Sequence, residues 1–261
     1  MCHHEAVCGR LTQQTDPAVI GQIFDADVRQ GDVPFAARYN LAPTDVVTTV
    51  LQREEGRVVE RIKWGLIPSW AKKASEGARM INARAETVAS SPAFRASFAR
   101  RRCIVPADGF YEWDRAEGRK QPYLFRPPAD GVLAMAGIWS VWKDPATGLW
   151  VPSAALITTA ANGTVGRIHD RMPVLLPRDV WALWLDPTLA DPAELQGLLV
   201  PAPDDVLAMH PVSRLVNSVR NDSPDLLTPL AELPDAADPV TPPKAAKAAK
   251  PVARDQGTLF D

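Results

Sequence analysis

Cys8, followed by Gly9-Arg10, carries the most distinctive chemistry near the start of the chain. A cysteine at a mature N-terminus holds two nucleophiles, an α-amine that titrates at about pH 8 and a thiol that titrates at about 8.5. An amine attacks an aldehyde to give a Schiff base. The thiol of the same residue can then close onto the imine carbon and form a thiazolidine ring. This chemistry requires Cys8 to be the first residue of the mature protein.

Six residues separate Cys8 from Met1, so its terminus must be generated. Removal of Met1 alone would expose Cys2 and leave Cys8 inside the chain. Translation from position 7 would expose Cys8, because a GTG start codon inside a longer reading frame is read as valine, and Val7 stands there. We favour this second interpretation, since Gly-Arg follows Cys8 and not Cys2. The alternative is that Cys8 is simply a small buried residue.

Composition predicts a globular, intracellular protein. The 261 residues are 46% hydrophobic, with no apolar run long enough to span a membrane and no pattern typical of a secretory signal. Three scattered cysteines favour a reducing compartment, and we expect a cytoplasmic protein. Residues 57–126 hold fifteen Lys and Arg against seven Asp and Glu, which indicates a polyanion-binding face; the alternative is basic side chains that merely solvate loops.

A metal site or cofactor is not expected. Cys2, His3, His4 and Cys8 are clustered, but their spacing matches no standard zinc pattern.

Periodicity and turn residues predict an α+β domain with a largely antiparallel, barrel-like sheet flanked by helices, because many strands appear without a βαβ rhythm. Asp16 and Pro17 are typical of a helix start at 17–30, and Glu54-Glu55-Gly56 indicates a hairpin. Further helices are predicted at 92–100, 178–185 and 191–199. Strands are predicted at 45–51, 57–64, 102–106, 109–113, 122–126, 132–140 and 154–159.

Six motifs occur in an order that resembles the SOS-response-associated peptidase (SRAP) family of abasic-site-processing proteins. They are Cys8-Gly9-Arg10, Arg38-Tyr39-Asn40-Leu41-Ala42-Pro43, Trp64-Gly65-Leu66-Ile67-Pro68-Ser69-Trp70, Asn82-Ala83-Arg84-Ala85-Glu86, Gly109-Phe110-Tyr111-Glu112-Trp113 and His169-Asp170-Arg171-Met172-Pro173. The resemblance implies a single domain at 8–232 with a barrel-like core, preceded by a doubtful extension at 1–7. It also implies single-stranded DNA binding, a covalent crosslink to abasic sites during the DNA damage response, and a lyase-like enzyme with autopeptidase activity. Cleavage between Val7 and Cys8 would then be a third route to the required terminus.

The resemblance places the site on Cys8, Asn82, Glu112 and His169, and the residue types suit those places. The Asn82 amide can both donate to and accept from the amine. A partly buried Glu112 would have a raised pKa and act as general acid and base. His169 can protonate the sugar oxygen and assist reversal of the crosslink. The alternatives are a turn asparagine, an exposed strand glutamate and a structural histidine.

DNA contacts are expected from arginines and tryptophans. Arg10, Arg84 and Arg171 are candidates for phosphate contacts, or else form salt bridges. Trp64 and Trp70 flank a tight turn and can stack on bases. Trp113, Trp139 and Cys103 are expected in the core.

Two other functions remain open, a non-covalent single-stranded DNA-binding module and a cysteine hydrolase that uses Cys8 with His169. A denaturing gel with an abasic oligonucleotide separates them, because only covalent attachment gives a shifted band.

The segment 233–261 is dominated by Pro, Ala and Lys and is predicted to be a disordered tail. It ends in Gln256, Leu259 and Phe260, spaced as in short peptides that dock on bacterial sliding clamps. The alternative is an incidental hydrophobic terminus.

Overall fold

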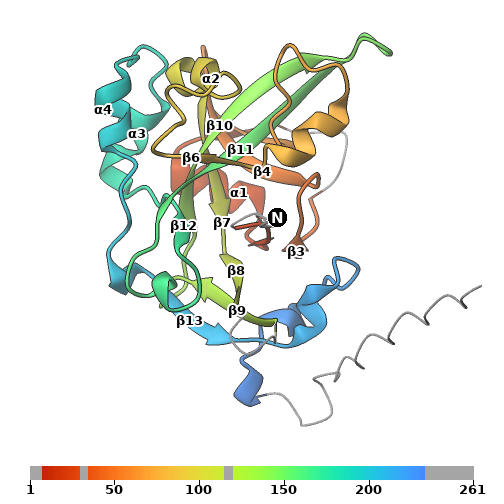
Figure 1. Cartoon of the computed structure of the whole chain (residues 1–261), viewed down its shortest axis with the longest axis vertical. Coiled ribbons are helices and arrows are strands. Elements are labelled where there is room, and N and C mark those ends of the chain that lie inside the picture. The colour runs from red at the N-terminus through yellow and green to blue at the C-terminus, as the bar shows by residue number, and fades with distance from the viewer. Residues whose placement is uncertain (1–7, 30–34, 115–119, 233–261) are drawn as a thin grey trace, which may run out of the picture.

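A closed barrel of five strands forms the centre of the molecule (Figure 1). The computed structural model describes residues 8–29, 35–114 and 120–232, and the predicted extension and tail lie outside these ranges. The barrel strands are β4 (Val46–Arg53), β5 (Gly56–Trp64), β7 (Arg102–Ala107), β10 (Leu133–Lys143) and β11 (Trp150–Ala160). Neighbouring strands are antiparallel except where β5 and β11 close the barrel in parallel, at Ser153↔Lys63 and Ala154↔Trp64. The predicted fold class is confirmed.

The hairpin predicted at Glu54-Glu55-Gly56 joins β4 to β5. Arg53 pairs with Gly56, whose φ of 135° is a conformation that favours glycine. The alternating side chains of the two strands point either into the barrel or toward the helices, so the strands are buried on both faces over much of their length. The pattern of β-branched residues therefore located both strands to within two residues.

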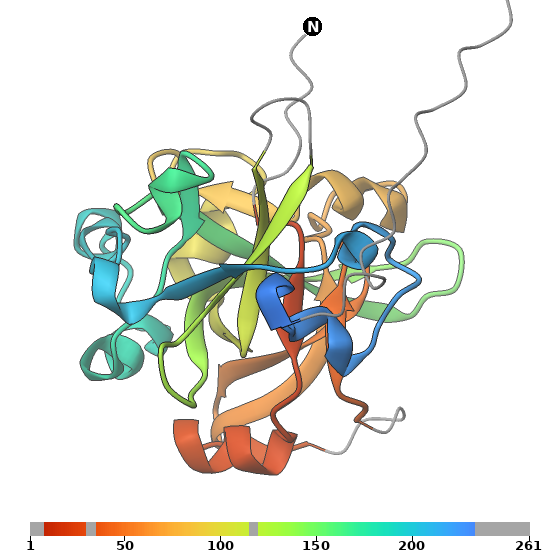
Figure 2. The same ribbon diagram turned by 90° about the horizontal axis from the view of Figure 1, so that it is seen from below.

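A second, antiparallel sheet lies below the barrel in Figure 1 and carries the N-terminal strand. Its order is β13 (Ala208–Pro211), β9 (Gln121–Arg126), β8 (Gly109–Asp114), β1 (Leu11–Gln13) and β3 (Arg38–Leu41). The Gln13 side chain donates to the carbonyls of Thr48 and Pro106, which fixes β1 against two barrel strands. Figure 2 shows this sheet from below, with the C-terminal segments lying across it.

The first helix, α1 (Pro17–Phe24), is shorter than predicted. Asp16 caps it by accepting from the Ala18 amide, and Pro17 is its first residue, as the sequence indicated. The chain leaves the helix at Asp25, which adopts a left-handed conformation with φ 52°. The prediction of helix through residue 30 was wrong, because β2 (Asp27–Val28) instead adds to β5 in parallel.

The other helices cover the upper and left sides of the barrel in Figure 1. They are α2 (Arg95–Arg100), α3 (Trp181–Leu185) and α4 (Pro192–Gly197). Two short strands, β6 (Asn82–Arg84) and β12 (Arg171–Pro173), both pair with β11. The 3-10 turns are η1 (Ala74–Arg79), η3 (Val165–Arg167), η4 (Arg178–Val180), η5 (Asp204–Val206), η6 (Arg214–Asn217), η7 (Pro224–Leu227) and η8 (Leu230–Glu232). Across the described ranges, no helix has the length and apolar character needed to cross a membrane.

Buried Arg102 ties the helical layer to β7. Its guanidinium donates to the carbonyls of Trp184, Phe98, Ala99, Asp186 and Leu189, although the side chain is only 2% exposed. Five acceptors satisfy the forked donor set and make the buried charge tolerable.

Candidate active site

Cys8 and Glu112 meet where β1 begins beside β8. The two strands are antiparallel, with Leu11 opposite Phe110, and the Tyr111 amide donates to the Arg10 carbonyl one step further toward the N-terminus. This ladder brings the Cys8 backbone nitrogen to the Glu112 carboxylate, at 2.5 Å from Oε1. A charge-assisted bond of that length fixes the carboxylate on the nitrogen.

Both groups are shielded from water. Cys8 is fully buried and Glu112 is 4% exposed. Burial, and then the negative charge of Glu112, raise the pKa of the Cys8 thiol well above its usual value, while the positive charge of Arg171 acts in the opposite direction. The thiol is therefore protonated at neutral pH. Cys8 also has a φ of 49°, a left-handed conformation that is uncommon for a residue other than glycine.

Asn82 is carried by β6, which extends alongside β11 in parallel, with Asn82 opposite Leu156. The residue before it, Ile81, is fixed from two sides. Its carbonyl accepts from the Leu156 amide at 2.9 Å and from the indole nitrogen of Trp64 at 3.1 Å. The backbone at Asn82 is therefore held rigidly against the barrel.

Trp64 corrects one of the expected DNA contacts. Its ring is 1% exposed and its indole N–H is donated to Ile81, so it has no free face for a base. Trp70, at the other end of the same motif, is 59% exposed and can stack on one. The two tryptophans thus separate into a core residue that supports Asn82 and a surface residue.

His169 lies between η3 and β12, half-buried. Its Nδ1 accepts from the Arg171 amide at 3.1 Å and is also 2.9 Å from the Asp170 carboxylate. These contacts require opposite protonation of Nδ1, because it accepts in the first and donates in the second. The backbone bond belongs to the neutral ring and the Asp170 contact to the protonated ring. The neutral ring then carries its proton on Nε2.

Arg171 forms the salt bridge that the sequence left open as an alternative, and its contact with phosphate stays a prediction. It donates to both carboxylate oxygens of Glu86, at 2.5 and 2.9 Å, and to the Thr158 carbonyl at 2.7 Å. The hydrogen bond from Arg171 is the main reason that the pKa of Glu86 lies below its usual value. This contact anchors the start of β12, and with it the segment that presents His169.

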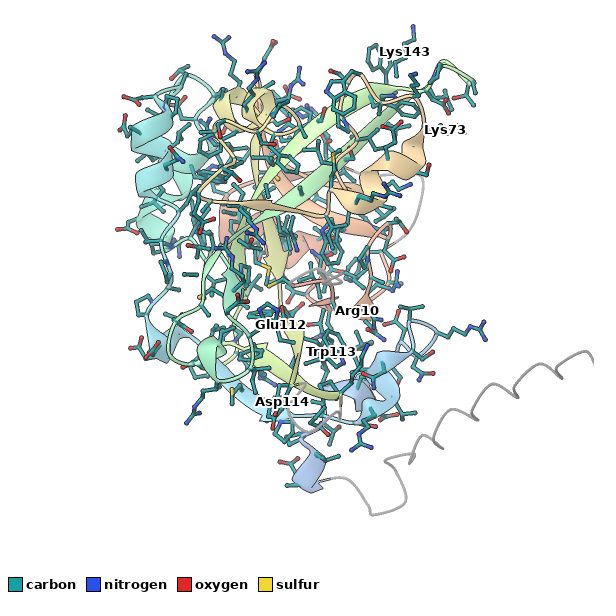
Figure 3. All side chains as sticks on the ribbon, viewed as in Figure 1. Arg10, Lys73, Glu112, Trp113, Asp114 and Lys143 are labelled. Carbon is teal, nitrogen blue, oxygen red and sulfur yellow. The ribbon has the colours of Figure 1, made fainter. Side chains whose placement is uncertain are left out.

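Arg10 also makes intramolecular contacts, and its contact with phosphate likewise stays a prediction. Its guanidinium donates to Asn40 Oδ1 and to the Val216 carbonyl, each at 2.7 Å, and lies 5.7 Å from the centre of the Trp113 ring. Trp113 in turn donates to Asn217 Oδ1 at 2.6 Å. Figure 3 labels Arg10, Glu112 and Trp113 close to one another. Of the three candidate arginines, Arg84 is exposed, whereas Arg10 and Arg171 are half-buried.

A C-terminal strap, residues 213–222, supports β3 and the segment that leads into β1, and sequence reasoning missed it. Asn40, fully buried, donates to the carbonyls of Val216, Ser218 and Asn221. Asp222 accepts from the amides of Tyr39 and Asn40. The motif around Asn40 was visible in the sequence, whereas no local pattern marks Asp222.

No cluster of three His, Cys, Asp or Glu suited to a metal ion occurs in the described ranges. Cys103 is fully buried in β7, as expected.

Comparison with known proteins identifies the family to which this chain belongs. The profile of the SOS response associated peptidase (SRAP) family matches residues 7–219. The chain belongs to the SRAP family. Its SRAP domain is 38% identical over 222 residues to "Abasic site processing protein YoqW" of Bacillus subtilis, covering 85% of this chain and 99% of that protein. "Abasic site processing protein HMCES" of Gallus gallus is 34% identical over 223 residues, covering 74% of this chain and 66% of that protein.

Solved structures also resemble the SRAP domain. A crystal structure of a protein from Bacteroides thetaiotaomicron superposes with a TM-score of 0.75 at 26% identity, covering 85% of this chain and 99% of that one. The family predicted from the six motifs is therefore confirmed.

Proposed function

We propose that this protein binds single-stranded DNA and forms a thiazolidine crosslink with the open-chain aldehyde of an abasic site. The observation that carries the proposal is the 2.5 Å contact between the Cys8 nitrogen and the Glu112 carboxylate, two groups that are both buried. An α-amine at that nitrogen is aimed at a group that can take and return its proton.

The reaction proceeds in two stages. The amine attacks the aldehyde carbon, and the resulting carbinolamine loses water to give an imine, with Glu112 transferring the protons. The thiol sulfur then bonds to the imine carbon, and the thiol proton passes to the nitrogen. The net change is aldehyde plus cysteine to thiazolidine plus one water.

The state of the thiol favours this order over a cysteine hydrolase. A hydrolase needs a thiolate, and reactive cysteines have a lowered pKa. Here burial and Glu112 raise the pKa of Cys8. The amine therefore attacks first, and the thiol gives up its proton only when the imine is already adjacent.

The mature protein begins at Cys8 in this proposal. The family profile begins at residue 7, which supports a start at Val7, read from a GTG codon, or cleavage of the Val7–Cys8 bond. Cleavage puts the hydroxyl of a water on the Val7 carbonyl carbon and a proton on the Cys8 nitrogen, and Glu112, beside that nitrogen, can pass on the proton that it takes from the water. The left-handed φ of Cys8 is local backbone strain of the kind that collects at functional sites.

Asn82 and His169 complete the proposed site. The Asn82 amide orients the amine, and His169, with its proton on Nε2, protonates the sugar oxygen during ring opening. Exposed Arg84 and Trp70 contact the phosphates and bases beside the lesion.

The test is a denaturing gel with an abasic single-stranded oligonucleotide, after intact mass spectrometry has identified the N-terminal residue. We expect a heat-stable shifted band from wild type. Cys8→Ser should give a band only with borohydride, which traps its Schiff base. Cys103→Ser, which changes the other buried cysteine, is the matched control and should crosslink normally. No wild-type band would leave a non-covalent DNA-binding module, and a heat-stable Cys8→Ser band without reductant would refute the ring.

We also propose that Gln256, Leu259 and Phe260 tether the domain to a replication sliding clamp at the nucleoid. A tether raises the local concentration of the domain near single-stranded DNA. A peptide of residues 250–261 should bind the cognate clamp, and a Leu259→Ala/Phe260→Ala peptide should not. Equal, millimolar binding by both peptides would refute the tether.

A further inference from the structure

The tip of the β10–β11 hairpin exposes an aromatic and a basic side chain that the fold does not need. Leu149 is 67% exposed and Trp150 is 65% exposed. Lys143 pairs with Trp150 across the hairpin, and its Nζ lies 5.6 Å from the centre of the Trp150 ring. We call these three residues the hairpin patch. A tryptophan left in water forgoes a large burial energy, so exposed patches of this kind mark interaction sites.

The hairpin itself is rigidly placed. Trp142, next to Lys143, is 2% exposed and donates to the Ala71 carbonyl at 2.7 Å. Val151, next to Trp150, packs on the same small core as Trp142 and Ala71. Because side chains alternate along a strand, the inward direction of Trp142 and Val151 turns Lys143 and Trp150 outward.

This arrangement joins the hairpin patch to the surface that carries Trp70. Ala71, which accepts from Trp142, directly follows Trp70, and Lys72 and Lys73 come next. Figure 3 shows Lys73 and Lys143 on the same upper corner of the molecule. Two exposed tryptophans and three lysines therefore lie at this end of the hairpin, with Lys143 and Trp150 on the face opposite Ala71.

The three lysines at this end of the hairpin favour a negatively charged partner. Two acids lie at this end as well, and both face their own backbone. Glu76 accepts from the amides of Lys72 and Lys73, at 2.8 and 3.1 Å, and Asp144 accepts from the Ala146 amide at 2.9 Å. No ion pair within the described part of the chain neutralises the three lysines. Positive charge beside open aromatic rings suits a strand of unpaired nucleotides.

A short single strand of DNA can span the distance between the hairpin patch and the proposed site. Asn82 pairs with Leu156 on β11, and Trp150 is six residues away on the same strand. At about 3.3 Å per residue this is about 20 Å, or about six stacked nucleotides at about 3.4 Å each. We propose that the hairpin patch binds the single-stranded DNA that flanks the lesion, about six nucleotides from it. This inference rests on the proposed function for the position of the lesion.

The test compares undamaged oligonucleotides of two lengths by fluorescence anisotropy, with wild type, Trp150→Ala and Lys143→Ala. One oligonucleotide has about three nucleotides on each side of the central position and the other has about fifteen, well past the distance to the hairpin patch. Trp150→Ala should weaken binding of the long strand by about 5- to 150-fold and leave the short strand unchanged. Lys143→Ala should lower the salt slope for the long strand by about 0.7.

Arg178→Ala is the matched control, because Arg178 lies over Trp181 at 5.8 Å on the helical side of the molecule. It should change neither strand. The inference is overturned if Trp150→Ala leaves long-strand affinity intact, weakens both lengths equally, or is matched by Arg178→Ala. Crosslinking of a short abasic oligonucleotide is measured separately, and its absence in wild type would refute the proposed function while the anisotropy data still decide the hairpin patch.

Discussion

Replacing Glu112 by glutamine isolates the proton-transfer role that we propose for the carboxylate. The side chain keeps its shape, and its amide oxygen can still accept from the Cys8 nitrogen, which lies 2.5 Å from Oε1 in the wild type. The substitution removes the ability of this buried side chain to take a proton. General acid and base catalysis contributes about 100- to 10,000-fold, or about 3–5 kcal/mol of activation free energy. We expect the crosslinking rate to fall by that factor.

The assay is a single-turnover time course with protein in excess over an abasic oligonucleotide, resolved on a denaturing gel. A parallel series with borohydride follows imine formation alone, and it should slow in the same variant. Asp114→Asn is the matched control, because Asp114 is two residues further along the same face of β8 (Figure 3). It should stay within about threefold of wild type. A Glu112→Gln rate that is also within about threefold, in a folded protein, would refute proton transfer by this carboxylate.

Three further outcomes follow from the contacts described. The rate of Cys8 alkylation by iodoacetamide, followed by mass spectrometry, should keep rising above pH 9 without a plateau, since burial and Glu112 raise the pKa of the thiol. Glu112→Gln should shift this pH profile to lower pH. An unshifted profile would contradict the contribution of Glu112 to the raised pKa. Arg102→Met should lower the free energy of unfolding, measured by urea denaturation, by about 2–4 kcal/mol, because five carbonyls lose their donor. A loss below about 0.5 kcal/mol would mean that the helical layer does not depend on Arg102. Arg84→Ala should weaken binding of undamaged single strands and reduce the salt slope by about 0.7, whereas an unchanged slope would place Arg84 away from phosphate.

Local patterns were sufficient to predict the barrel strands. The β-branched runs around Glu54-Glu55-Gly56 set β4 and β5, and Asp16-Pro17 set the start of α1. The end of α1 was not predictable, because Asp27 and Val28 are drawn into pairing with β5, which is a tertiary effect. The closure of the barrel between β5 and β11 joins residues about ninety positions apart and leaves no local trace.

The site was predicted unevenly for the same reason. The motifs indicated Cys8 and Glu112, and the structure joins them through the β1–β8 ladder. An arginine in a motif, however, does not reveal what its guanidinium contacts. Arg10 and Arg171 proved to be occupied by Val216 and Glu86, partners 206 and 85 residues away.

The 206-residue separation of Arg10 and Val216 has a consequence for synthesis on the ribosome. The segment that bears the nucleophile is translated first, and the strap that supports it is translated almost last. At about 5–20 residues per second, roughly 10–40 s pass between the two. During that interval the cysteine strand has emerged without its mature support. In the proposed reaction, the Cys8 amine therefore gains its full structural support only when the domain is essentially complete.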